Sequence, residues 1–303
     1  MRTTVAGRVL VLLIGILATP GRAAAVAGEA PAAAMRWTDP DGKTLPFASD
    51  DELLVFLRTA DVQSEKELSG GITVPKKLLL EKDGVRANAV FRDVHEEKSG
   101  ATFSGGVGDL FFRDNYVFEP AAYELSRLLG LDNVPPATLR KLHGKKGSVQ
   151  IWVEHAMTET KRVKDKIEPP DEARWKKQLQ MMNVFDALVY NTDRNRGNIL
   201  ITPDWKLWMI DHTRAFRRNT ELQDAAALKQ CERGMYEKLK ALDEAVARER
   251  LKEYLSNLEI NAMLKRRKLI LERLDQLIVG NGEDAVLYVY TEPPPASPPP
   301  PNP

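Results

Sequence analysis

Cysteine and histidine are both scarce in this sequence. One cysteine, Cys231, stands among 303 residues, so no disulfide bond can form within the chain. The four histidines are scattered and show no HExxH or similar ligand spacing. The sequence therefore excludes a disulfide-rich scaffold and gives no support to a zinc enzyme.

An excess of charge of one sign is also missing. The chain carries 44 Lys and Arg against 43 Asp and Glu, a formal net charge of +1. So small a net charge creates no general field that would attract nucleic acid or an anionic membrane, and we expect no nucleic-acid partner. Hydrophobic residues make up 43% of the chain and charged residues 29%. This composition is typical of a globular protein, and 303 residues are enough for one large domain or two lobes.

The N-terminal apolar run, residues 9–18, is too short to cross a membrane comfortably. Arg2 and Arg8 flank its start, and the small residues Ala25-Val26-Ala27 follow it. This order is typical of a secretory signal peptide with its cleavage site. We therefore predict a signal peptide at residues 1–27 and an exported protein, periplasmic or secreted. Cleavage would leave no stable membrane span, whereas an uncleaved segment would anchor the protein to the membrane.

After the predicted signal peptide, strand patterns dominate the first half of the chain. Residues 28–60 predict a linker and a short helix, which Ser49 caps. Within a strand-rich region at 61–160, the turn Asp83-Gly84 predicts a hairpin and residues 118–131 predict a helix. The glycine-rich stretch at 99–115 is interpreted as a linker.

Helical patterns dominate the second half. Residues 171–190 predict a long helix, and two or three amphipathic helices are expected over 221–278, with Cys231 on one of them in the core. The whole helical region is placed at 161–285. A proline-rich tail at 291–303 is expected to be extended, as a spacer or as a ligand for a proline-binding domain.

The loop NTDRNRGNIL, residues 191–200, concentrates polar side chains between the long helix and a predicted hairpin. The hairpin folds back, so Asp211 at its far end is expected within a few ångströms of Asn198. Carboxylate and amide oxygens suit Mg²⁺ or Mn²⁺, and an Asp-x₄-Asn pair with a later Asp is the pattern that kinases use for phosphoryl transfer. The alternative is a polar turn that caps its own backbone, but such a turn does not require Asp211.

Neighbouring polar residues are assigned structural roles. We expect Arg194 to brace the loop and Asp186, on the preceding helix, to form a cap or a salt bridge. His212 directly follows Asp211 and is expected to be packed and hydrogen-bonded.

The segments FDALVYNTDRNRGNIL and LWMIDHTRAF resemble the catalytic segment of atypical kinases of the phosphatidylinositol 3-/4-kinase-like, HipA-type and Golgi secretory casein kinase families. Upstream, FEPAAYELSRLLGLDNVPPATLRK is similar to the E-x-A-A-[FY] helix and V-P-P strand of the Golgi casein kinase family. The resemblance covers about residues 65–280. It implies an α+β, two-lobed protein-kinase-like fold, with a β-rich N-lobe at 61–160 and a mostly α-helical C-lobe at 161–285.

The same resemblance implies a set of site residues, with ATP and Mg²⁺ or Mn²⁺ in the cleft. Asp193 would orient the attacking hydroxyl, while Asn198 and Asp211 would hold the metal. Glu119 would be the glutamate of the N-lobe helix, which reaches toward the metal or toward a nucleotide-binding lysine. Glu124 is the alternate on the same helix.

Two further segments complete the implied nucleotide site. Ser69, Gly70 and Gly71 would form the loop that covers the phosphates, because glycine lets backbone N–H groups come close. The backbone around Glu154 and His155 would line the adenine pocket.

Arg92 departs from the pattern of the relatives, which have lysine at the end of A-x-F-K. Arginine is always charged and grips phosphate with a planar fork, so the exchange is not conservative. Either Arg92 takes the role of the lysine, or another basic residue such as Lys77 does, or the protein is a weak or non-catalytic relative. We expect an active kinase that moves the ATP γ-phosphate to a hydroxyl on a protein, lipid, sugar or metabolite. The alternatives are a pseudokinase that binds nucleotide, an adenylyltransferase and a purely structural exported protein.

Overall fold

The structure, a computed structural model, describes residue 1 and residues 37–68, 74–102 and 108–292. The predicted signal peptide, Ser69, Gly70, Gly71 and most of the proline-rich tail lie outside these residues. Everything below concerns the described residues of the unit 34–303. Within the described part, no helix combines the length and apolarity that a membrane crossing needs.

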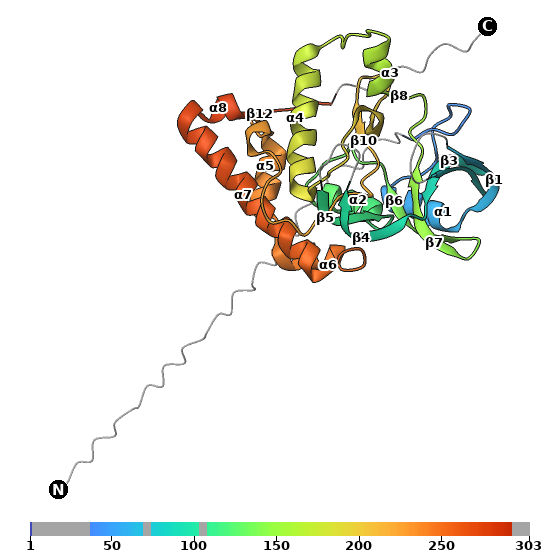
Figure 1. The fold of residues 1–303 in the computed structure, drawn as a ribbon, viewed down its shortest axis with the longest axis horizontal. Helices are drawn as coiled ribbons and strands as arrows, with labels where there is room; N and C mark the ends of the chain where they lie inside the picture. Colours follow the sequence, from blue (N-terminus) through green and yellow to red (C-terminus); the bar gives the residue numbers. More distant parts are fainter. Residues whose placement is uncertain (2–36, 69–73, 103–107, 293–303) are drawn as a thin grey trace. The chain divides into compact units, whose positions relative to one another are not determined.

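A five-stranded antiparallel sheet forms the first half of this unit (Figure 1), with the strand order β1-β2-β3-β7-β6. Its strands are β1 (Asp61–Glu67), β2 (Lys76–Lys82), β3 (Val85–Arg92), β6 (Ala137–Leu142) and β7 (Lys145–Ile151). Asp83 and Gly84, with φ of 53° and 76°, make the predicted tight turn between β2 and β3, since this hairpin turn needs positive φ. On β3, Ala89 and Phe91 are buried in the core, so Val90 and Arg92 face the opposite side of the sheet.

Two helices pack against this sheet. Helix α1 (Asp50–Thr59) starts as predicted at Ser49, whose Oγ accepts a hydrogen bond from the backbone N–H of Glu52. Helix α2 (Phe118–Leu128) is buried along most of its length and contacts β6, β7 and a helix of the second half, α6 (Glu244–Leu251). Helix α2 therefore connects the sheet to the helical part.

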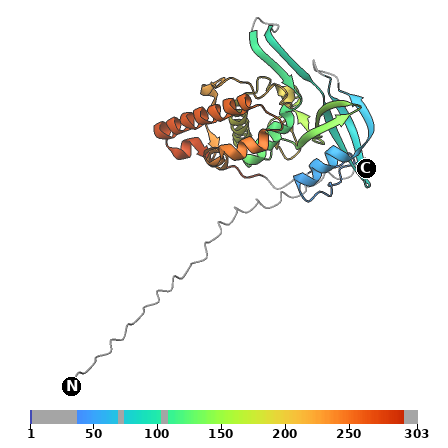
Figure 2. The ribbon, with the colours of Figure 1, turned by 90° about the horizontal axis from the view of Figure 1, so that it is seen from below.

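The prediction of a glycine-rich linker at residues 99–115 is wrong. Strands β4 (His95–Thr102) and β5 (Gly108–Asn115) pair there as an antiparallel hairpin, seen as a teal pair in Figure 2. Glycine and serine weaken the local strand signal, whereas cross-strand pairing depends on a partner that the local pattern does not reveal. At the hairpin's end, Asn115 N–H donates to the carbonyl of Thr213, far along the chain.

The second half is mostly helical. Its other helices are α3 (Glu159–Lys164), α4 (Glu172–Val189), α5 (Arg233–Ala241), α7 (Asn257–Asn281) and α8 (Glu283–Val286), with 3₁₀ turns η1 (Arg196–Asn198) and η2 (Ala225–Ala227). Strands β8 (Met157–Thr158), β9 (Ile199–Ile201) and β10 (Leu207–Met209) form a small sheet, and β11 (Cys231–Glu232) pairs with β12 (Leu287–Tyr288). Cys231 is buried as expected, but it lies on a strand and not on the predicted helix.

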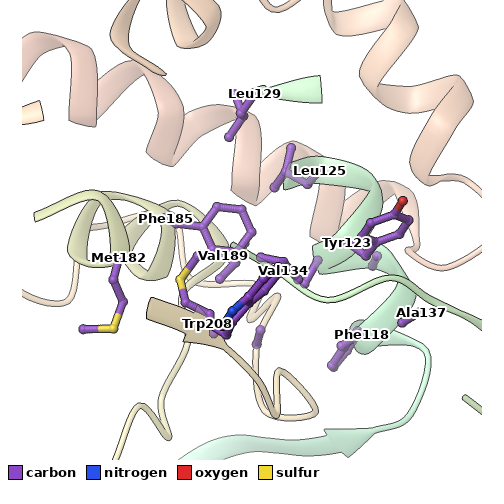
Figure 3. Close-up of a cluster of buried hydrophobic side chains, with 14 of the residues drawn as sticks. Phe118, Tyr123, Leu125, Leu129, Val134, Ala137, Met182, Phe185, Val189 and Trp208 are labelled. Carbon is purple, nitrogen blue, oxygen red and sulfur yellow. The ribbon is translucent and has the colours of Figure 1, made fainter. Parts of the chain in front are cut away.

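A hydrophobic core joins the two halves (Figure 3). Phe118 and Leu125 of α2 belong to one buried cluster with Phe185 of α4 and Trp208 of β10. Burial of apolar surface contributes roughly 25 cal/mol per Å², so this core fixes α2 relative to the end of α4. The loop that follows α4 is thereby held beside α2.

Candidate functional site

A cavity of about 490 Å³ lies between β3 of the large sheet and the polar loop after α4. Arg92 of β3 lines it together with three residues of the second half that the sequence analysis singled out, Asp193, Asn198 and Asp211. Its apolar lining comes from both halves: Val90, Ile151, Val153, Ala156, Leu200 and Ile210. The structure thus brings the central candidate residues together.

Hydrogen bonds fix the loop from the end of α4. Tyr190 ends the helix in the left-handed conformation. Asn191 donates from Nδ2 to Oδ1 of Asp186 at 3.1 Å and accepts the backbone N–H of Asp193 at 3.0 Å. The amide of Asn198 then donates to the carbonyl of Asp193 at 2.8 Å. The positions of Asp193 and Asn198 are therefore set by the loop itself.

Arg194 braces the loop, as predicted. Its guanidinium pairs with both oxygens of Asp186 at 2.9 and 3.1 Å, which confirms the expected salt bridge. It also donates to the carbonyls of Asn198 and Ile210, both at 2.7 Å, and contacts Nε2 of His212 at 2.9 Å. One always-protonated side chain thus ties the loop to the end of the hairpin.

Asp211 follows β10 and returns to the loop. The N–H of Ile210 donates to the carbonyl of Asn198 at 3.2 Å, which confirms the expected approach. The backbone of Asp211 is left-handed, with φ of 59°, a conformation that few residues other than glycine adopt. Its Oδ1 accepts from Thr213 Oγ at 3.0 Å and lies 3.8 Å from Nε of Arg92.

Glu119 is fully buried on α2 and surrounded by donors. Its Oε1 accepts the backbone N–H of His212 at 2.7 Å, and its Oε2 accepts Nε2 of Gln150 at 3.2 Å. Nε of Arg92 lies 3.9 Å from Oε1. Burial raises the pKa of Glu119, but the charge of Arg92 and the hydrogen bonds from His212 outweigh it and hold the pKa well below its usual range.

His212 is packed and hydrogen-bonded, as predicted. Its ring is fully buried and meets Phe185 edge-on, with ring centroids 5.9 Å apart. Because Arg194 can only donate, its contact at Nε2 places the proton of a neutral ring on Nδ1. That nitrogen lies 3.6 Å from Oε2 of Glu119.

The alternate glutamate, Glu124, pairs elsewhere. Its Oε2 accepts from Arg250 of α6 at 2.6 Å. Neither glutamate lines the cavity, but Glu119 lies beside Arg92, which does. The structure therefore favours Glu119 over Glu124 as the acidic residue beside the site.

The predicted adenine segment lies at the cavity only in part. Trp152, Val153 and Ala156 line the cavity, whereas Glu154 and His155 do not. Glu154 accepts from Asn88 Nδ2 at 2.6 Å, and His155 is exposed. The contact of the Glu154 and His155 backbone with a nucleotide stays a prediction.

Lys77, the alternative to Arg92, lies with Nζ 4.4 Å from the ring centroid of Trp152. Lys77 does not line the cavity, whereas Arg92 does and lies beside the acidic residues. Ser69, Gly70 and Gly71 are outside the described residues, but Leu68 and Pro75 on either side of that loop line the cavity.

Sequence reasoning missed Arg214 and Asp114. Arg214 donates from Nε to Asp114 Oδ2 at 3.0 Å and from Nη1 to Asp193 Oδ2 at 3.2 Å. Burial lowers the pKa of Arg214, but the surrounding carboxylates raise it by more than burial lowers it, so the pKa lies above its ordinary value. Arg214 stands three residues after Asp211, and this nearness to a candidate site residue could have drawn attention to it. Asp114 lay in the stretch interpreted as a linker, where no sequence signal pointed to it.

The donor set of Asn198 and Asp211 fits a single hard cation. None of the described hydrogen bonds uses Oδ1 of Asn198 or Oδ2 of Asp211, and such oxygens are the ligands that Mg²⁺ and Mn²⁺ prefer. In the described ranges, no group of three or more His, Cys, Asp or Glu side chains could hold a metal ion. The remaining ligands would come from phosphate and water, as is usual for Mg²⁺.

No protein-family model matches the chain, and no curated protein sequence matches it. Solved structures do resemble it. Hydra Fam20 with sugar is 14% identical, with a TM-score of 0.60, over 79% of this chain and 92% of that one. A Golgi casein kinase structure is 16% identical, with a TM-score of 0.59, over 85% and 80% of the two chains. Another, with Mn/ADP bound, is 17% identical, with a TM-score of 0.57, over 80% of each.

These likenesses show the fold. The described part of the chain has the mixed α and β, kinase-like architecture of Fam20 and the Golgi casein kinase. The resemblance stated from the sequence, to atypical kinases of the Golgi casein kinase kind, is confirmed at the level of fold.

Proposed function

We propose that the protein is an ATP-dependent phosphotransferase that acts on a hydroxyl group. The observation that carries the proposal is the meeting of Asp193, Asn198, Asp211 and Arg92 in one cavity. The strand that carries Arg92 is far in the sequence from the loop and the hairpin end that carry the other three residues. The kinase-like fold supports the proposal, as does the Mn/ADP bound to one structure of similar fold.

The cavity suits a nucleotide in both size and lining. At about 490 Å³ it lies within the usual range of ligand sites. The adenine ring would lie against Val90, Val153 and Leu200, with its edge toward the backbone of residues 153–156. The phosphates would then extend toward Arg92, whose guanidinium is a strong phosphate donor.

Phosphoryl transfer needs positioning more than covalent help from the protein. The acceptor oxygen forms a bond to the γ-phosphorus while the bond to the β–γ bridging oxygen breaks, and ADP leaves with that electron pair. The hydroxyl proton passes to the carboxylate of Asp193, which Arg214 holds in place at 3.2 Å. A Mg²⁺ or Mn²⁺ ion bound by Asn198 and Asp211 would neutralise phosphate charge.

One specific observation favours a second candidate, a nucleotide-binding pseudokinase. Both carboxylate oxygens of Asp193 already accept hydrogen bonds, from Arg214 at 3.2 Å and from Asn195 at 3.1 Å. Arg92 also stands where the relatives have lysine. An adenylyltransferase would use the same cavity and transfer AMP in place of a phosphoryl group.

Thermal melting with and without Mn²⁺–ATP tests the proposal. A ligand at 100 times its Kd stabilises a protein by about 2.7 kcal/mol, so we expect the Tm of the wild type to rise by several degrees. Asp211→Ala should reduce this rise without abolishing it, because it removes a proposed metal ligand. Asp41→Ala, an exposed residue that does not line the cavity, should keep it.

The product then separates the candidates. A phosphoryl mass on a hydroxyl acceptor supports the kinase, AMP on the acceptor indicates adenylylation, and stabilisation without ATP turnover indicates a pseudokinase. If Mn²⁺–ATP shifts the Tm of neither protein, the cavity does not bind nucleotide and the proposal is wrong.

A further inference from the structure

We propose that the guanidinium of Arg92 is a built-in cation that takes the place of a second metal ion. The nucleotide phosphates would then bind with no more than one divalent cation and would stay bound when that cation is removed. This inference rests on the proposed binding of nucleotide in the cavity.

Arg92 lies between two carboxylates. Its Nε is 3.9 Å from Oε1 of Glu119 and 3.8 Å from Oδ1 of Asp211. The side chain of Arg92 is 9% exposed and that of Glu119 is fully buried. The guanidinium of Arg92, a cationic group, therefore lies within 4 Å of both carboxylates.

Both carboxylate oxygens of Glu119 already accept hydrogen bonds from buried donors. Its oxygens accept from the backbone N–H of His212 at 2.7 Å and from Gln150 at 3.2 Å, and Nδ1 of His212 faces Oε2 at 3.6 Å. A metal ion there would displace these buried donors, which is costly because they would lose their partner. It would also lie beside the like charge of Arg92.

Arg92 also offers a donor to the cavity. Its Nη1 is buried and makes no hydrogen bond, although the side chain lines the cavity. Buried N–H groups without a partner are rare in folded proteins. A phosphate oxygen would satisfy this donor with a short, charge-assisted hydrogen bond.

Asp211 and Asn198 leave a position for a metal ion. Oδ2 of Asp211 and Oδ1 of Asn198 take part in none of the described hydrogen bonds, so a single divalent cation can bind there. Asp211 therefore serves two cations at once, the guanidinium through Oδ1 and the metal ion through Oδ2.

Two measurements on the purified full-length protein test this. Calorimetric titration with ADP, in Mn²⁺ and again in EDTA, should give Kd values within tenfold of each other. Electron paramagnetic resonance with saturating ADP should count one bound Mn²⁺ per chain. A loss of more than tenfold in EDTA, or two bound Mn²⁺ ions, would overturn the inference while leaving the proposed function intact.

Variants locate the effect at Arg92. Arg92→Lys keeps the charge but cannot pair with Glu119 and Asp211 and reach phosphate together, so its Kd in EDTA should rise by more than tenfold and recover in Mn²⁺. Asp211→Asn should bind ADP in EDTA at least as tightly as the wild type and gain nothing from Mn²⁺. Arg86→Lys, a matched change at an exposed position of the same strand, should change neither value.

The outcomes also separate the inference from the function on which it rests. If ADP binds to the wild type in neither buffer, both are wrong. If Arg92→Lys and the wild type bind ADP equally well in EDTA, the inference alone is wrong. Unliganded melting curves of all variants show whether each one folds.

Discussion

Glu119 keeps its negative charge inside the protein because its neighbours supply compensating groups. Burial by itself would raise its pKa, but Arg92 and the donors of His212 lower the pKa from its ordinary 4.5 to about 2. A carboxyl group with a lowered pKa stabilises the folded protein above its ordinary pKa. That stabilisation is lost as the pH falls from about 4.5 through about 2.

Glu119→Gln should remove this pH dependence. The difference between 4.5 and about 2 corresponds to on the order of 3 kcal/mol, so the variant should be less stable than the wild type by roughly that amount at pH 7. The gap should close as the pH approaches 2. Urea unfolding over a pH series measures it, with the exposed Glu67→Gln as a control. Parallel curves at all pH values would contradict the assigned charge state.

At the scale of elements, β7 holds β3 at the point where Arg92 lies. Ser148 pairs with Arg92 across the two strands, and Gly147 stands beside that pair. A Cβ atom at Gly147 would collide with the carbonyl oxygen of Arg92 and the ring of Phe91. The absence of a side chain there is therefore what lets β7 approach β3 so closely.

Gly147→Ala should destabilise the protein by about 1–3 kcal/mol, the usual cost of overpacking, and weaken ADP binding by moving Arg92. Gly280→Ala is the matched control, because Gly280 lies in α7 with open space around its Cβ position. An alanine in a helix should stabilise by up to about 1 kcal/mol. Thermal melting measures whether the stability changes of the two variants have opposite signs, and calorimetry measures their ADP binding. A Gly147→Ala variant as stable as the wild type would show that β7 and β3 can separate without cost.

For the whole molecule, contacts between distant segments hold the cavity. Asn115 donates from the end of β5 to the carbonyl of Thr213, and Met209 donates to the carbonyl of Asn133. Glu124 of α2 pairs with Arg250 of α6. The strand-rich and helical parts are thus joined on more than one side of the site, so we expect them to unfold together.

We also propose that the whole protein is exported. Expression in a bacterial host followed by mass spectrometry should give a product that begins at Gly28, because the predicted cleavage site ends at Ala27. Fractionation should place it outside the cytoplasm. A product that keeps residues 1–27 and sediments with membranes would indicate the anchored alternative, and an intact product in the cytoplasm would contradict export.

Several features of the fold and site could be read from the sequence because they depend on neighbouring residues. Ser49 caps α1 through the N–H three residues on, and Asp83-Gly84 makes a turn within its own four residues. The loop that holds Asp193 and Asn198 is built from its own hydrogen bonds. In each case the partners are close in the chain, so the local pattern carries the information.

Only the tertiary structure decided the rest. It shows that β4 and β5 pair where a linker was expected, that Glu119 and not Glu124 lies beside Arg92, and that Arg214 joins Asp114 to Asp193. These outcomes depend on groups up to a hundred residues apart, brought together by burial of a shared core. The sequence by itself determined the polar groups of the loop and of the hairpin end, and packing determined which other groups meet them, because side-chain contacts follow from the three-dimensional arrangement.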